Sequence, residues 1–461
     1  MIKLSHCLFL LFLDLFVQAQ SDLILKYNPE NENTVITIGK NQYIGCDSLI
    51  SIISRWNQYP DLNQANRNFI FYYDDPFFNK VPLRVFIPQT YRSNEKCPLV
   101  LLLHGALQIS SFEKANKYHE EGAVHEEEDD NDLFFKYLSK KGFIILRPFG
   151  DEKRKFSWIV NEFVDPAHST EIEGGVNLTY RALVNAIIQL KRMLNIDDSR
   201  IYSLGHSDGS DGTFCMELFQ PTLFAGFVLY NSLMSNIYAS NIYLRNVINR
   251  PMYIVHSDLD DIRPIQQTRA IVNLIRKANK ADSTLFYKEY AGYRHFDKHL
   301  VIDLPFANQF LLQTVRNPYS RIKHLESNNL IDNQCDWIKV NSFDLTLPKS
   351  AWQVSLNLNS FNKNNKTWMD FPYYHNTESF AIQASFENNI FTIETSRVKT
   401  FEILISENMV DLKKPIKVYV NGKLAYDEIV APDRKFTLRS FAENFDRQAI
   451  WVNSVKINCQ Y

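Results

Sequence analysis

Short apolar runs recur along the first two thirds of the chain, separated by polar or amphipathic stretches. The runs NFIFYY (68–73) and PLRVFIP (82–88) enclose a polar segment, which predicts two antiparallel strands joined by a turn. The run CPLVLLL (97–103) is apolar at nearly every position, a pattern typical of strands buried on both faces. These elements predict a sheet with a covered interior strand.

Five further apolar runs follow, and helical patterns separate most of them. They are GFIILRP (142–148), RIYSLG (200–205), AGFVLYN (225–231), PMYIVH (251–256) and TLFYKEY (284–290). The longest helical pattern extends from Leu178 to Leu194, and another from Leu300 to Val315 would close the region. Strands that alternate with helices predict a mostly parallel sheet flanked by helices. We expect residues 67–318 to form this α/β domain, after an N-terminal segment 20–66.

The pattern changes after a segment 319–334, which we interpret as a linker. Short alternating segments dominate residues 335–461, and tight-turn signals join them. Asn421 and Gly422 occupy the two positions of a hairpin turn that require positive φ, and Asn388 and Asn389 give a weaker signal of the same kind. We therefore expect an all-β, sandwich-like C-terminal domain.

The first 19 residues have the order of a signal peptide. Lys3 precedes an apolar run from Cys7 to Phe16, and the small residues Val17 and Ala19 favour cleavage after Ala19. The alternative is a buried N-terminal helix. The run is shorter than the about 20 apolar residues that cross a bilayer. The sequence thus predicts a secreted or periplasmic protein without a membrane span.

Length and charge narrow the function classes. A chain of 461 residues exceeds one ordinary core, which agrees with two domains. The formal net charge of −2 leaves no broad basic face, so we do not expect nucleic acid as a partner.

Export would permit disulfides, and an odd number of cysteines would remain after cleavage: Cys46, Cys97, Cys215, Cys335 and Cys459. Because the first and last strands of a sandwich are often neighbours, one hypothesis pairs Cys335 with Cys459. The alternative is five unpaired, buried thiols.

The strongest chemical signal is the motif Gly205-His206-Ser207-Asp208-Gly209, which follows a predicted strand and precedes a predicted helix. The spacing G-x-S-x-G in this context predicts a nucleophile elbow, a turn so tight that it needs small residues two before and two after the serine. A purely structural turn is the alternative. We expect Ser207 to be the nucleophile.

In such a site the backbone N–H after the nucleophile, together with one from the turn after an earlier strand, forms the oxyanion hole. These donors would belong to Asp208 and Ala106. His104, at the end of the same early strand, is more typical of a structural histidine than of an acid or base. Phe156 and Trp158 lie after another strand, where they could line a pocket or pack in the core.

The acid and the base of a triad would follow the serine in the chain. Asp258, Asp260 and Asp261 lie in the acidic turn after PMYIVH, and each could orient an imidazole. His295 lies in the loop before the last helix, and His299, one helical turn later, would face elsewhere.

The stretch NIDDSRIYSLGHSDGSDG resembles I-D-x-x-R-I-Y-x-x-G-x-S-x-G of the α/β-hydrolase superfamily, in the group of prolyl-oligopeptidase-type peptidases, esterase D and polyhydroxybutyrate depolymerase-like esterases. The resemblance covers about Asn68 to Ser320. The family pattern H-G-x-x-D-x-x-x-P assigns the acid to Asp260, which lies between His256 and Pro264. It implies the triad Ser207, Asp260, His295 and cleavage of an ester or peptide bond through an acyl-enzyme. The chain departs from the family at Ser257, usually glycine, and at Asp208, where many members have a neutral residue.

The predicted chemistry needs no cofactor or metal. Glu120, Glu121, His125 and the acidic run from Glu126 to Asp132 could hold a hard cation, but such runs are typical of solvated loops. A competing function is a binding protein on a hydrolase scaffold, because a fold does not guarantee its chemistry. A third possible function is adhesion or sugar binding by the C-terminal domain alone.

Overall fold

We describe a computed structural model of the chain. The described residues are 46–57, 59–60, 62, 67–106, 112, 130–151, 154, 156–158, 177–234, 243–279, 284–354, 360–362, 364–369 and 378–459. The predicted signal peptide 1–19, the residues Glu120, Glu121 and His125, and the acidic residues Glu126 to Asp129 lie outside them. No helix in the described ranges is long and apolar enough to cross a membrane.

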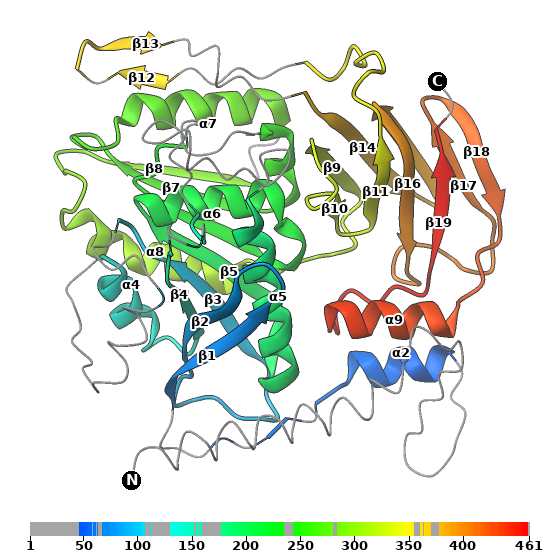
Figure 1. Ribbon diagram of the computed structural model, residues 1–461, viewed down its shortest axis with the longest axis horizontal. Coiled ribbons are helices and arrows are strands. Elements are labelled where there is room, and N and C mark those ends of the chain that lie inside the picture. Colours follow the sequence, from blue (N-terminus) through cyan, green and yellow to red (C-terminus); the bar gives the residue numbers. More distant parts are fainter. Residues whose placement is uncertain are drawn as a thin grey trace.

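Eight strands of the described chain form one sheet in the order β1-β2-β4-β3-β5-β6-β7-β8 (Figure 1). Its strands are β1 (Asn68–Asp75), β2 (Asn79–Phe86), β3 (Cys97–Leu103), β4 (Ile144–Pro148), β5 (Ile196–His206), β6 (Gly226–Tyr230), β7 (Met252–Ser257) and β8 (Leu285–Tyr290). β2 is antiparallel to both β1 and β4, and all other neighbours are parallel. The predicted hairpin and the predicted mostly parallel sheet are confirmed.

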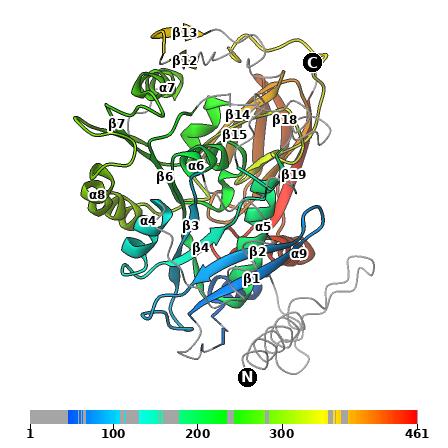
Figure 2. The ribbon, with the colours of Figure 1, turned by 60° about the vertical axis from the view of Figure 1, so that its left-hand side comes forward.

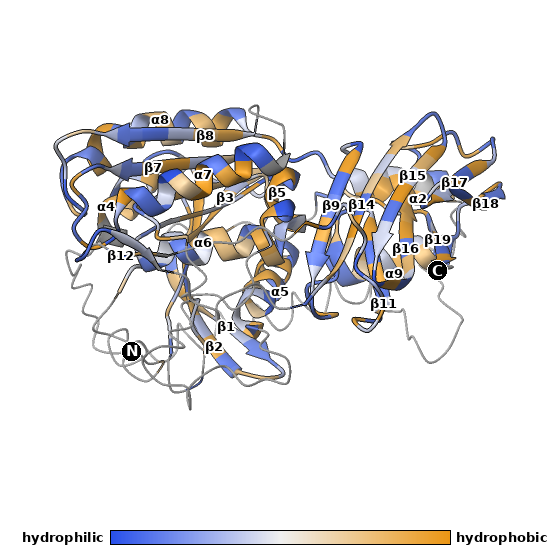
Figure 3. Cartoon of the chain, turned by 90° about the horizontal axis from the view of Figure 1, so that it is seen from above, coloured by the Kyte–Doolittle hydropathy of each residue, from blue (hydrophilic) through white to orange (hydrophobic). Residues whose placement is uncertain are grey.

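Helices cover both faces of this sheet (Figure 2). They are α4 (Asp130–Leu138), α5 (Leu178–Met193), α6 (Asp208–Phe219), α7 (Ile265–Asn279) and α8 (His299–Gln313). Alternate residues of β3 enter two separate cores: Leu101 joins the core that includes α5, α6 and α7, whereas Val100 joins the core of α4 and α8. This explains the unbroken apolar run of β3. Figure 3 shows the matching pattern on the helices, with α5 and α7 banded in hydrophilic and hydrophobic residues.

The C-terminal part contains two further sheets in its described residues, in the orders β10-β11-β16-β19 and β18-β17-β15-β14-β9. The strands are β9 (Ile322–Ser327), β10 (Gln334–Cys335), β11 (Ile338–Phe343), β14 (Phe380–Glu387), β15 (Ile390–Ser396), β16 (Val398–Ile405), β17 (Ile416–Val420), β18 (Lys423–Glu428) and β19 (Asn453–Asn458). Both predicted tight turns are present, and Asn388, Asn389, Asn421 and Gly422 all have positive φ. A small hairpin of β12 (Ser360–Asn362) and β13 (Thr367–Met369) lies beside α7.

Two predictions for this part were wrong. The segment 319–334, expected as a linker, contains strand β9, which pairs with β14. Lys323 on β9 is fully buried and pairs with Asp336 at 2.5 Å. Because a charged residue occupies a buried position, the sequence of β9 lacks the apolar–polar alternation of a strand. The region 335–461 is also not all-β, since α9 (Arg434–Asn444) begins at Asp433, whose side chain caps the helix.

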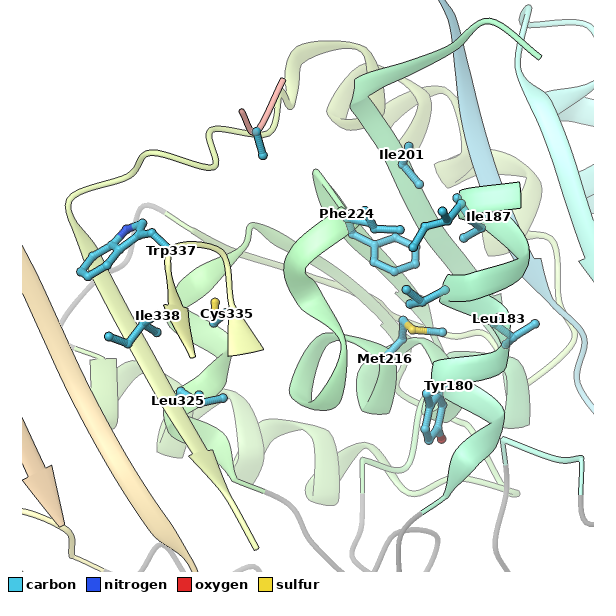
Figure 4. Packing of buried hydrophobic residues seen from close by; sticks show 14 of the residues in the cluster. Tyr180, Leu183, Ile187, Ile201, Met216, Phe224, Leu325, Cys335, Trp337 and Ile338 are labelled. Atoms are coloured by element: carbon cyan, nitrogen blue, oxygen red, sulfur yellow. The ribbon is translucent and has the colours of Figure 1, made fainter. Parts of the chain in front are cut away.

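Buried ion pairs join the C-terminal part to the larger sheet. Asp198 of β5 contacts Lys191 of α5 at 2.8 Å and Arg447 at 2.6 Å, and all three side chains are at most 2% exposed. Arg250 contacts Asp336 at 2.6 Å in the same way. One cluster of buried apolar residues extends across this junction. Figure 4 labels Met216 and Tyr180 on one side and Trp337 and Leu325 on the other. The helix α2 (Cys46–Ser54) packs against α9.

The five cysteines of the described residues are all unpaired, so the hypothesis of a Cys335–Cys459 disulfide was wrong. Cys335 lies in β10, and Cys459 follows β19 at the opposite edge of the same sheet. With strands spaced about 4.8 Å apart, three strand spacings exceed the Cα separation of roughly 4.4–6.8 Å that a disulfide permits.

Candidate active site

Ser207 occupies a sharp turn between β5 and α6. Its backbone has φ 56° and ψ −124°, a strained conformation for a residue with a side chain. A Cβ on Gly205 would lie 2.1 Å from the carbonyl oxygen of Gly209, and one on Gly209 would lie 2.0 Å from that of Leu103. Only glycine fits at either position, which accounts for the spacing of the motif.

Asp260 and His295 form a buried pair at the carboxyl ends of the neighbouring strands. Nδ1 of His295 lies 2.7 Å from Oδ2 of Asp260, and Oδ1 of Asp260 accepts the backbone N–H groups of Ile262 and Arg263. Burial alone would raise the pKa of the Asp260 carboxyl, but these hydrogen bonds, that from His295 first, outweigh it and lower the pKa to about 2. The carboxylate is therefore ionised and orients the imidazole. Nε2 of His295 is buried and has no hydrogen-bond partner among the described residues.

The other residues considered for the acid and the base have different partners. Asp258 accepts the backbone N–H of Gly292. Nε2 of His299 donates to Oδ1 of Asn231 at 3.0 Å, so its hydrogen bond is to Asn231 and not to Asp260.

Asn231, at the end of β6, links these groups. Its Nδ2 donates to Oδ2 of Asp260 and to Oγ of Ser257, both at 2.7 Å, and Ser257 in turn donates to the carbonyl of Arg294. Ser257 is thus more than a substitute for the usual glycine, because its hydroxyl ties the Asp260 loop to the His295 loop. Asn231 was not predicted from the sequence, in which it appears only as a polar residue at the end of an apolar strand.

His206, which precedes Ser207, contacts the His295 loop. Its Nε2 donates to the carbonyl of His295 at 3.1 Å, and the two rings lie 4.6 Å apart. The ring of Phe296 packs edge-on against His295. Packing from two elements therefore holds the imidazole close to the elbow.

Arg263 lies beside Ser207. Its Nε donates to Oγ of Ser207 at 3.2 Å, and its other nitrogens pair with Asp208 and Asp211 of α6. No hydrogen bond joins Ser207 to His295 in the described part of the chain. Neither Arg263 nor its contact with Asp208 was predicted, although an acid directly after the nucleophile was a signal that a cation would compensate it.

The turn after β3 approaches the elbow from the other side. A Cβ on Gly105 would lie 3.5 Å from the Cβ of Ser207, which brings Ala106 to the edge of the site. His104 is structural: Nδ1 donates to the carbonyl of Gly105, and Nε2 accepts the N–H of Gly150. Burial lowers the pKa of His104 to about 4.

Phe156 and Trp158 are at most 2% exposed and pack in the core, so they do not line an open pocket.

A mostly parallel sheet with an antiparallel second strand carries a strand–serine–helix turn at the carboxyl end of a central strand. The chain has the α/β-hydrolase fold. In α/β-hydrolases the acid and the histidine follow the serine in chain order on later strands, which is the order of Asp260 and His295 after Ser207 here.

No protein-family model matches the sequence, and no characterised protein sequence matches it. Among solved structures, this chain is similar to a thermostable esterase, with 21% sequence identity and a TM-score of 0.41 over 54% of this chain and 64% of that one. An S-formylglutathione hydrolase from Agrobacterium tumefaciens has 14% identity and a TM-score of 0.38, over 55% of this chain and 98% of that chain. A puromycin-hydrolyzing peptidase from Mycobacterium tuberculosis has 16% identity and a TM-score of 0.38, over 56% and 41%.

The described residues contain no group of three or more His, Cys, Asp or Glu side chains that could hold a metal ion.

Proposed function

We propose that the chain is an exported serine hydrolase that cleaves a carboxylic ester or peptide bond with Ser207, Asp260 and His295. The observation that carries this proposal is the buried His295–Asp260 pair at 2.7 Å, whose free Nε2 lies in the same site as a serine in the strained elbow conformation. An ionised carboxylate on Nδ1 makes the opposite ring nitrogen a proton acceptor. This is the arrangement that a serine nucleophile requires.

In the proposed reaction, Oγ of Ser207 attacks the carbonyl carbon while its proton moves to Nε2 of His295. The backbone N–H groups of Ala106 and Asp208 would stabilise the oxyanion. The leaving alcohol or amine takes the proton from His295, and an acyl-enzyme remains. Water then attacks this ester, gives a proton to His295 and releases the acid, and Ser207 regains its proton.

The two C-terminal sheets are proposed to form a sandwich-like domain appended to the hydrolase. Contacts of Trp337, between β10 and β11, with the rings of Phe386 and Phe391 on the other sheet support this. Five further aromatic side chains of the region are also buried, which favours a packing role over sugar binding for these rings: Phe380, Phe401, Phe441, Phe445 and Trp451.

A fluorophosphonate probe tests the proposed nucleophile. Wild-type protein should be labelled on Ser207, and Ser207→Ala should abolish both labelling and turnover of p-nitrophenyl esters or chromogenic peptides. The matched control is Ser210→Ala, which removes another buried serine hydroxyl of the same helix. Labelling that persists in Ser207→Ala, or a wild type inert to the probe and to both substrate panels, would refute the proposal.

A further inference from the structure

The side chain of Arg263 contacts both Ser207 and the helix that follows it, α6. Its side chain is 4% exposed and lies three residues after Asp260, on the loop that follows β7. Each of its three guanidinium nitrogens contacts a different residue: Nε contacts Ser207 Oγ at 3.2 Å, and the terminal nitrogens contact Asp211 and Asp208. The guanidinium therefore bridges the elbow and the first turn of α6.

The protein holds this guanidinium from both sides. The backbone N–H of Arg263 donates to Oδ1 of Asp260 at 2.7 Å, and its carbonyl accepts Nε2 of His256 at 2.9 Å. On the helix side, Oδ1 of Asp211 accepts the hydroxyl of Ser232 and the N–H of Leu233. A planar cation fixed in this way points its Nε–H at one place, the oxygen of Ser207.

The charge balance around the nucleophile explains why a cation is needed. Asp208 and Asp211 place two carboxylates in the first turn of α6, next to a hydroxyl that must carry negative charge during the proposed reaction. Burial raises the pKa of the Asp208 carboxyl, and the nearby Arg263 acts in the opposite direction. Without Arg263 both carboxylates would oppose charge on Ser207.

We propose that Arg263 is a further catalytic residue, which donates a hydrogen bond to Ser207 Oγ while its bond to the acyl carbon forms and breaks, and which compensates the charges of Asp208 and Asp211. The proposal rests on the serine-hydrolase function proposed above. In acylation, Oγ loses its proton to His295 and bonds to carbon; in deacylation, that bond breaks and Oγ recovers a proton from His295. Arg263 remains protonated throughout and stabilises the same oxygen in both steps.

This role also accounts for Asp208, the residue at which the chain departs from many α/β-hydrolases. Its carboxylate is turned toward Arg263 instead of the oxyanion position, so its backbone N–H remains usable as a donor. Arg263 and Asp208 therefore form a unit. Removing both charges should perturb the electrostatics of the site less than removing Arg263 alone.

Stopped-flow kinetics with p-nitrophenyl acetate on the full chain tests the proposal, because it separates acylation from deacylation. Arg263→Leu should slow both steps about 100-fold, as loss of one donor to a reacting oxygen does in other enzymes, with KM within about twofold of wild type. The midpoint of the acid limb of the kcat/KM profile should move to higher pH, because two uncompensated carboxylates favour the protonated site. Arg263→Leu combined with Asp208→Asn should return the midpoint toward the wild-type value while leaving the rate low.

Arg250→Leu is the matched control, since it removes another buried arginine that pairs with an aspartate, Asp336, outside the site. It should lower stability and leave the midpoint unchanged. If Arg263→Leu does not fold, Arg263→Lys decides: it keeps the charge but not the Nε–H, so both rates should fall at least tenfold with an unshifted midpoint.

Wild-type rates in the folded Arg263→Leu or Arg263→Lys variant would overturn this role while leaving the proposed function intact. A wild type that is neither labelled nor active would instead refute the proposed function itself.

Discussion

The amide nitrogen of Asn231 and Nδ1 of His295 each lie 2.7 Å from the same carboxylate oxygen, Oδ2 of Asp260. The amide cannot reverse its orientation without loss, because Oδ1 of Asn231 accepts Nε2 of His299. A fully buried side chain thus fixes the position of the carboxylate that orients the imidazole. In the proposed triad, Asn231 would act as a positioning residue, because it contacts the carboxylate and not the reacting atoms.

Replacing Asn231→Asp should therefore lower kcat with little change in KM. The new carboxylate cannot donate to Asp260 and repels it, and a lost hydrogen bond to a charged group is worth about 1.5–3 kcal/mol, or roughly 10- to 100-fold in rate. Steady-state kinetics on a p-nitrophenyl ester measures the change.

Asn249→Asp provides the control for this substitution. Asn249 is also buried and hydrogen-bonded, to Asn246 and His324, but it lies away from the site. The control should destabilise the fold and keep kcat per active site. Equal losses of kcat in both variants would show that Asn231 has only a structural role.

The close approach of Gly209 to β3 predicts that Gly209→Ala destroys the elbow. The added Cβ would lie 2.0 Å from the carbonyl of Leu103, so either the helix or the strand must shift. Labelling of Ser207 by a fluorophosphonate should be lost. In Gly422→Ala the new Cβ meets open space, although φ is +80°, so its cost should be limited to about 1–2 kcal/mol of strain and its labelling unchanged. A normally labelled Gly209→Ala variant would contradict the geometry.

Stability should decrease in mildly acidic solution, in part through His256. Burial lowers the pKa of His256 to about 4, whereas the unfolded chain has the ordinary value of about 6.5. Between about pH 6.5 and pH 4 the unfolded state binds more protons than the folded state. The free energy of unfolding therefore decreases as the pH is lowered through this range, by up to about 1.4 kcal/mol per pH unit for one histidine. Urea denaturation at pH 7, 6 and 5 measures this slope, which His256→Gln should reduce. An unchanged slope in His256→Gln would count against the assignment.

The buried contact between Asp198 and Arg447 predicts a large loss of stability in Arg447→Met. Asp198 would keep Lys191 but lose a partner in a site closed to water, and breaking a buried pair costs about 3–5 kcal/mol. Arg321→Met is the comparison, because Arg321 and Glu387 are 69% and 66% exposed and such pairs contribute roughly 0–1 kcal/mol. Urea midpoints should separate the two variants. Similar midpoints would mean that the junction contributes little.

Apolar runs were sufficient to predict the large sheet. Strands β3, β5, β6 and β7 are buried on both faces, so they appear in the sequence as short, nearly continuous apolar segments. The elbow was predictable for a related reason, since the close contacts of Gly205 and Gly209 impose residue types that are visible in the sequence.

Contacts between distant segments were not predictable. An arginine in a polar loop is ordinarily exposed, so the sequence gives no sign that Arg263 is buried. Its proposed role depends on α6 lying against the loop that follows β7. Strand β9 was missed for the same reason. Lys323 indicates an exposed position in the sequence, but its side chain is buried in an ion pair with Asp336. Side chains with charged partners far along the chain carry no periodic signal, so neither strand β9 nor the Ser207–Arg263 contact could be read from the pattern.

Arg447 follows Asp198 by 249 residues. At about 5–20 residues per second, a ribosome needs roughly 12–50 s to synthesise that interval. During that time β5 and α5 exist without Arg447, and Asp198 can pair with Lys191 but not with Arg447. The larger sheet is thus completed by residues made long after its own strands, so a pause in translation or an early holding chaperone would prolong an incompletely folded state of that sheet.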